Sequence, residues 1–127
     1  MLNKRTLLAT FWSILILIFC LINLSKISST QNISFPHVDK VVHFIFYTAA
    51  SFLWLWALIN KKENRQRYKI LGIILALMLF GFVIEILQDV LPTKRAFEWW
   101  DVAANVTGVF AGTIVFLLYQ YRKPHQV

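Results

Sequence analysis

The chain has 127 residues, of which 58% are hydrophobic, 16% aromatic and only 15% charged. A soluble domain of this length cannot bury so much apolar side chain, so the composition excludes an ordinary water-soluble fold. The net charge of +7 could suggest a nucleic-acid partner. Because no basic stripe alternates with aromatic residues, we expect no nucleic-acid partner. Cys20 is the only cysteine, which excludes an intrachain disulfide and a cysteine-rich metal site.

The apolar residues fall into four blocks, at about 7–24, 41–59, 70–91 and 102–121. At a rise of about 1.5 Å per residue, a helix over any of these blocks is about 27 to 33 Å long, which matches the hydrocarbon core of a bilayer. The sequence therefore predicts a single membrane domain over residues 1–127. Its fold class is all-α, an integral membrane four-helix bundle surrounded by the lipid bilayer.

Basic residues are distributed unevenly around these spans. The N-terminus, the second connection and the C-terminal tail hold most of them: Lys4, Arg5, Lys61, Lys62, Arg65, Arg67, Lys69, Arg122 and Lys123. The first and third connections hold Lys26, Lys40, Lys94 and Arg95, and five of the six acidic residues belong to the same side, either in these connections or in the adjoining part of the third span. Because cationic loops stay in the cytoplasm, the pattern predicts a multi-pass protein with both termini cytoplasmic.

Aromatic residues with a polar edge lie mostly near the expected span ends. They are Trp12, Trp54, Trp56, Tyr68, Trp99, Trp100, Tyr119 and Tyr121. Such rings prefer the headgroup zone of a bilayer, so we expect them to anchor the depth of the helices rather than to perform chemistry.

Polar residues in the outer parts of the last three spans recur at helical spacing. The stripes are Asp39, His43 and Tyr47 in the second span, Glu85, Gln88 and Asp89 in the third, and Asp101, Asn105, Gly108 and Gly112 in the fourth. Residues three or four apart share one face of a helix, so each stripe forms a single face. All three stripes lie toward the same side of the membrane.

His43, Glu85 and Asn105 lie at a similar depth, about 6 to 9 Å below the outer boundary of their spans. A charged side chain facing lipid costs about 2.5 to 3.5 kcal/mol at the membrane centre, so these residues should face one another or a polar pocket. Asp39 and Asp101 also fit as helix caps, and His43 alone also fits as a hydrogen-bonded interior histidine. Glu85 is the strongest functional candidate, because an acid within an apolar span has few structural explanations.

The expected pocket offers groups of both charges. Arg95, in the short connection 92–101, can fold back toward it, and with Lys40 and two helix N-termini it suits an anion. The carboxylates suit an amine, a proton or a divalent metal, and the sequence does not choose among these. We therefore assign no cofactor and no metal ligands. Ala104, Gly108 and Gly112 form a small-residue face that predicts close helix packing.

The series of polar residues resembles the motifs of the VanZ-like family over about residues 35–118. It comprises Asp39, Lys40, His43, Tyr47, Glu85, Gln88, Pro92, Arg95, Asp101, Asn105, Gly108 and Gly112. The resemblance implies a small bacterial multi-pass membrane protein, from a family named for a member associated with low-level resistance to the glycopeptide teicoplanin. It implies functional positions at Asp39, His43, Glu85, Gln88, Arg95, Asp101 and Asn105, and it supplies no settled reaction.

Three functions remain open. The leading hypothesis is a protein of the bacterial cell membrane whose outer pocket binds an envelope component, such as a lipid-linked wall precursor or a glycopeptide-related ligand, and modulates teicoplanin susceptibility. The alternative is a membrane-embedded enzyme that uses His43 with Glu85 or Asp101 on a lipid or wall precursor. The third is transport of a proton or small ion by Glu85. The sequence leaves open whether the chain forms a homo-oligomer.

Overall fold

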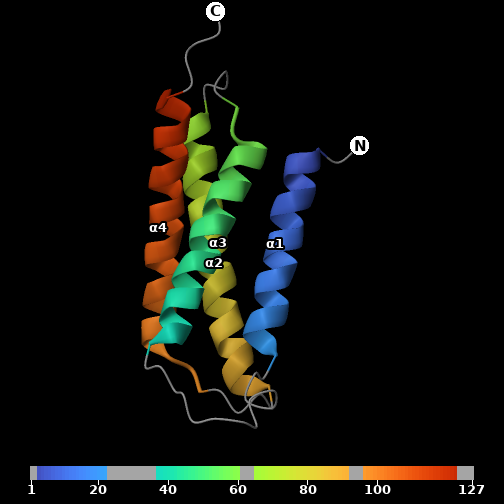
Figure 1. Cartoon of the computed structure of the whole chain (residues 1–127), viewed down its shortest axis with the longest axis vertical. Helices are drawn as coiled ribbons and strands as arrows, with labels where there is room; N and C mark the ends of the chain where they lie inside the picture. The colour runs from blue at the N-terminus through green and yellow to red at the C-terminus, as the bar shows by residue number, and fades with distance from the viewer. Residues whose placement is uncertain (1–2, 23–36, 61–64, 92–95, 123–127) are drawn as a thin grey trace, which may run out of the picture.

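The computed structural model describes residues 3–22, 37–60, 65–91 and 96–122, and within these ranges it is all-helical. The helices are α1 (Lys4–Leu21), α2 (Val38–Leu58), α3 (Gln66–Val90) and α4 (Trp99–Arg122), shown in Figure 1. All four are long and apolar enough to cross a membrane. The prediction of an all-α protein with four membrane-type helices is thus confirmed.

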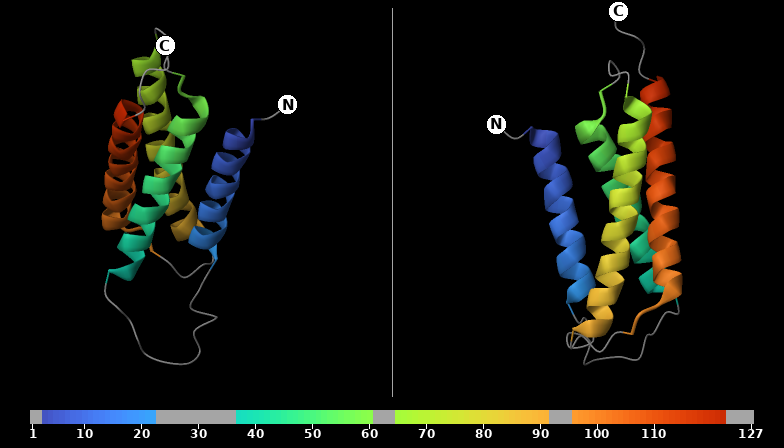
Figure 2. Two further views of the ribbon diagram at one scale, coloured as in Figure 1. Left: turned by 45° about the horizontal axis from the view of Figure 1, so that its top comes forward. Right: turned by 180° about the vertical axis from the view of Figure 1, so that it is seen from behind.

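Successive helices run in opposite directions, so the start of α1 and the end of α4 lie at the same end of the bundle (Figure 1). We call this the terminal end. The opposite end, which holds the start of α2, the end of α3 and the start of α4, is called the far end. α2 and α4 are the most closely packed pair, whereas α1 packs against α2 and α3 and lies away from α4 (Figure 2).

All four helices begin three or four residues before the apolar blocks indicated, and two of these extensions carry site residues. α2 begins at Val38 and α4 at Trp99, so Asp39 and Asp101 lie within the first turns of these helices. Apolar blocks mark where a helix enters the hydrocarbon, while the helix itself continues into polar residues at the membrane surface. The position before α2 is His37, at a positive φ of 79° and without a side-chain capping bond. Neither aspartate is therefore an N-cap residue.

The outer surface of the bundle is apolar and its interior is partly polar. Leu75, Leu79, Ile114 and Leu118 are each more than half exposed. The buried polar side chains are those of His43, Ser51, Glu85, Gln88, Asp101, Asn105 and Thr113. This distribution is the reverse of that in a soluble protein, and it is expected where lipid surrounds the helices and polar groups must bond to one another.

The close contact between α2 and α4 depends on two glycines. A Cβ atom on Gly108 would lie 2.5 Å from the backbone oxygen of Phe44, and one on Gly112 would overlap the backbone oxygen of Thr48. Absence of a side chain at these positions therefore lets the two backbones touch. Ala104, the third residue of the predicted small-residue face, is only half-buried.

Two indole groups attach α1 to α2. The Nε1 atom of Trp12 donates to the backbone oxygen of Phe46 at 3.0 Å, and the Nε1 atom of Trp54 donates to Oγ of Ser13 at 3.0 Å. Both rings lie within the helices rather than at their ends, so a headgroup anchor does not describe them. Polar bonds of this kind hold membrane helices together where apolar contact gains nothing over contact with lipid.

We predict that Gly112→Ala lowers the stability of the protein by about 1 to 3 kcal/mol, because the new methyl group forces α2 and α4 apart. Thermal unfolding of the purified protein in detergent measures the effect. Gly72→Ala is the matched control, since a Cβ there meets nothing within 4 Å and alanine favours the helix. Equal melting temperatures for the two variants would contradict the role of the glycine contact.

Candidate functional site

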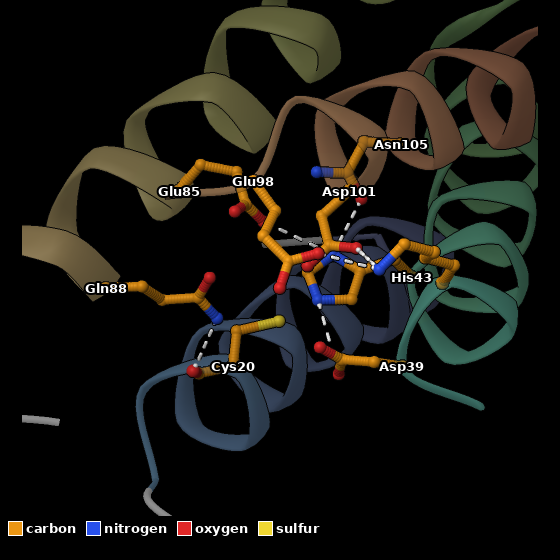
Figure 3. Close-up of polar contacts among 9 residues, drawn as sticks. Cys20, Asp39, His43, Glu85, Gln88, Glu98, Asp101 and Asn105 are labelled. Carbon is orange, nitrogen blue, oxygen red and sulfur yellow. Dashed lines mark hydrogen bonds and ion pairs between the residues drawn. The ribbon is translucent and has the colours of Figure 1, made fainter. Parts of the chain in front are cut away.

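Polar side chains from three helices gather inside the far end of the bundle (Figure 3). We call this group the polar cluster, and it consists of Asp39, Lys40 and His43 from α2, Glu85 from α3, Glu98 just before α4, and Asp101 and Asn105 from α4. Three helix faces that are far apart in the sequence therefore meet at one place.

His43 lies at the centre of the polar cluster. Its Nδ1 atom lies 3.0 Å from Oδ1 of Asn105 and 3.5 Å from Oε1 of Glu85. With an amide oxygen as its partner, Nδ1 is the donor of this hydrogen bond. The side chains of His43 and Glu85 are 2% and 0% exposed, so both are enclosed by protein. One imidazole ring thus connects α2, α3 and α4.

The other ring nitrogen of His43 faces the carboxylate of Asp39. Nε2 lies 3.9 Å from Oδ1 of Asp39, one helical turn earlier in α2. Asp39, His43 and Asp101 each offer a ligand atom, and these atoms lie within 4.8 Å of one another. These three residues could hold a metal ion, although the sequence led us to assign no metal ligands. The spacing of Asp39 and His43 was visible in the sequence, but the approach of Asp101 was not.

Lys40 pairs with two acidic residues near α4. Its Nζ atom donates to Oε2 of Glu98 at 2.7 Å and lies 3.3 Å from Oδ1 of Asp101. The Asp101 side chain is 3% exposed, whereas that of Glu98 is 51% exposed. The ammonium group therefore offsets part of the charge of a buried carboxylate. Sequence reasoning missed the Lys40–Glu98 pair, because 58 residues separate the partners.

Gln88 stands apart from the centre of the polar cluster. The Gln88 amide is buried and donates from Nε2 to the backbone oxygen of Cys20 at 2.7 Å, which connects α3 to the end of α1 (Figure 3). Arg95, which we predicted to fold back over the site, lies outside the described residues.

The layer beneath the polar cluster contains a tyrosine that the sequence placed at headgroup level or in packing. Tyr47 is fully buried, and its ring lies 6.3 Å from that of Phe80. Gly81 makes room for this arrangement, because a Cβ there would lie 3.1 Å from both Tyr47 and the amide of Asn105. Gly81 was not among the predicted site residues. Its position one turn before Glu85 was the feature of the sequence that could have indicated it.

We predict that Asn105→Leu destabilises the protein by about 0.6 to 2 kcal/mol, because the donor Nδ1 of His43 then loses its amide acceptor inside the membrane. Thermal unfolding in detergent provides the measurement. Thr107→Val, on the exposed face of the same helix, should change stability by less than about 0.5 kcal/mol. An Asn105→Leu protein as stable as the wild type would show that this hydrogen bond contributes nothing.

Comparison with known proteins agrees with the motif series. No curated protein and no solved structure matches the chain. A family model described as VanZ/LLP1 matches residues 3–120, which includes α1 as well as the three helices that carry the polar cluster. The chain therefore belongs to the VanZ/LLP1 family.

Proposed function

We propose that this VanZ/LLP1 protein binds a component of the bacterial cell envelope at its polar cluster and thereby modulates susceptibility to teicoplanin. The observation that carries the proposal is the convergence of His43, Glu85, Asp101 and Asn105 at one end of the bundle, all nearly fully buried. Four buried polar side chains give the bundle no stability that apolar side chains would not also give. A role in binding therefore explains them better.

The proposed orientation directs the polar cluster outward. The helix ends at the terminal end carry basic side chains, among them Arg5, Arg65, Lys69 and Arg122. Basic residues favour the cytoplasmic side, which would put both termini in the cytoplasm and the far end on the outer surface. Wall precursors and glycopeptides meet on that outer surface.

The ligand we propose is anionic, because Lys40 can exchange partners. Glu98 is half exposed and holds Lys40 by a single ion pair, and exposed pairs of this kind contribute only about 0 to 1 kcal/mol. A phosphate or carboxylate could replace Glu98 at little cost. Arg95, a few residues earlier, is proposed as a second cation whose planar guanidinium group suits the same ligand. A lipid-linked wall precursor carries both kinds of anionic group.

One observation also favours a membrane-embedded enzyme. His43 contacts Glu85 through Nδ1 and faces Asp39 through Nε2, which is an arrangement suited to general acid–base catalysis. Mass spectrometry of envelope precursors distinguishes the two functions, since an altered covalent structure would favour catalysis and unaltered precursors would favour binding.

Transport has less support from the interior of the bundle. Below the polar cluster, Ser51 and Thr113 are buried and hydrogen-bonded to each other at 3.0 Å. Nearer the terminal end, the buried side chains in the described ranges include Leu55 and Phe116. A proton or ion that left Glu85 would meet apolar packing there.

We predict that expression in a susceptible bacterium raises the inhibitory concentration of teicoplanin, and that Glu85→Gln returns it to the level of an empty vector. Loss of the buried carboxylate removes the partner of His43 while keeping the side-chain shape. Asp89→Asn removes the same charge from an exposed site one turn further along α3 and should retain the effect. Vancomycin is tested in parallel, and protein levels are compared by immunoblot. No wild-type effect, or full activity of Glu85→Gln, would refute the proposal.

We also predict the sidedness of the two ends. In a Cys20→Ala background, Ala96→Cys at the far end should react with a membrane-impermeant thiol reagent in intact cells. Asn60→Cys at the terminal end should react only after permeabilisation. Both positions are exposed, so accessibility within the protein does not distinguish them. The reverse labelling pattern would place the polar cluster on the cytoplasmic side.

A further inference from the structure

We infer that Asp39, His43 and Asp101 form a binding site for one divalent transition-metal ion, for which Zn²⁺ is the best match. The three potential ligand atoms lie within 4.8 Å of one another, and they come from two helices whose backbones touch. The inference concerns the metal alone and does not depend on the proposed role in glycopeptide susceptibility.

The distances suit a small ion. Zinc lies about 2.0 to 2.2 Å from nitrogen and oxygen ligands, so two ligands of a tetrahedral site are about 3.3 Å apart. The 3.9 Å between Nε2 of His43 and Oδ1 of Asp39 is too long for a hydrogen bond and close to the separation that a shared ion requires. The Asp39 side chain is 45% exposed, so it has room to rotate inward. Three protein ligands leave a fourth position for water or an oxygen of a bound molecule.

The orientation of His43 is independent support for the site. Nδ1 donates its proton to Oδ1 of Asn105, and Oε1 of Glu85 lies 3.5 Å from the same atom. When the ring is neutral in this tautomer, Nε2 carries a lone pair and lies 3.9 Å from the carboxylate of Asp39. A cation between the two groups makes that arrangement favourable, and a metal ion can fill this role. Metal-binding histidines are held in the same way, with the second ring nitrogen donating to an amide or carboxylate oxygen.

Asp101 also has capacity for a further ligand. Its side chain is 3% exposed, and among the described residues the partner of its Oδ1 atom is Nζ of Lys40 at 3.3 Å. That ammonium group makes its shorter contact with Glu98, and Oδ1 has no further hydrogen-bond donor among these residues. Lys40 thus supplies positive charge to Asp101 when no metal is bound. Because that charge repels a metal ion at the same carboxylate, Lys40 competes with the metal.

The donor set indicates the type of metal. One imidazole nitrogen and two carboxylate oxygens suit zinc and its neighbours in the first transition row. Calcium and magnesium prefer sites made entirely of oxygen ligands, and copper(I) prefers sulfur. Cys20 lies buried near the end of α1 and is not one of the three proposed metal ligands, so the proposed site offers no sulfur.

Zinc titration of the purified full-length protein in detergent, after removal of any affinity tag, tests the inference. Competition with a chromophoric chelator measures affinity and stoichiometry, and the visible spectrum of bound Co²⁺ reports coordination. We expect one Zn²⁺ per chain, and binding weakened by about tenfold or more in Asp39→Asn and His43→Ala. Lys40→Gln should bind zinc more tightly, a result that general loss of structure would not produce.

His37→Asn is the matched control, because His37 is exposed beside α2 and asparagine tolerates its positive φ. Its zinc affinity should equal that of the wild type. Absence of saturable binding, unchanged affinity in Asp39→Asn, or loss of binding in His37→Asn would each overturn the inference. Circular dichroism checks the fold of each variant, and if His43→Ala fails to fold, the partly exposed Asp39→Asn decides the outcome. Because the assay contains no antibiotic, its result is separate from that of the susceptibility test.

Discussion

The hydrogen bond between His43 and Asn105 forms only because α2 and α4 approach closely. Gly108 and Gly112 let the two backbones touch, and one turn above this contact the imidazole and the amide come within 3.0 Å. In lipid there is no water to satisfy either group, so the bond and the contact support each other. Glu85 lies near Nδ1 of the same ring and Asp39 near Nε2, and Asp101 offers a third ligand atom within 4.8 Å of those of Asp39 and His43.

Charge in the polar cluster is graded from the interior toward the surface. Glu85 and Asp101 are almost fully buried, Lys40 is partly buried, and Glu98 is half exposed. A buried carboxylate is tolerated only when positive charge or hydrogen-bond donors lie nearby, and Lys40 and His43 occupy those positions. The outermost member of this series is Glu98, which is the group that an anion would replace under the proposed function.

α1 has a different relation to the rest of the bundle. Most of its side chains face outward, and it is joined to its neighbours by the indoles of Trp12 and Trp54 and by the amide of Gln88. Such bonds are directional and few, so they position a helix without requiring a large packed interface. Gln88, which belongs to the same stripe as Glu85, thus serves the attachment of α1 rather than the centre of the site.

The sequence by itself indicated that lipid surrounds the helices, how many membrane-type helices to expect, and which helix faces carry polar residues. These properties follow from local patterns, because apolar length sets a membrane span and a spacing of three or four residues sets a helix face. It also indicated that His43, Glu85 and Asn105 lie at a similar depth, since depth in a helix is a count of residues. It placed the helix ends less well, because helices extend beyond their apolar residues.

Only the tertiary structure decided which atoms meet. A polar stripe indicates which face of a helix turns inward, but the exact rotation and the contacts with neighbouring helices depend on side-chain packing. For this reason the pairing of Lys40 with Glu98, the choice of Asn105 rather than an acid as the nearest partner of His43, and the approach of Asp101 to Asp39 emerged only from the structure. Gly81 was overlooked for the same reason, since its small size matters only because Asn105 and Tyr47 press against it.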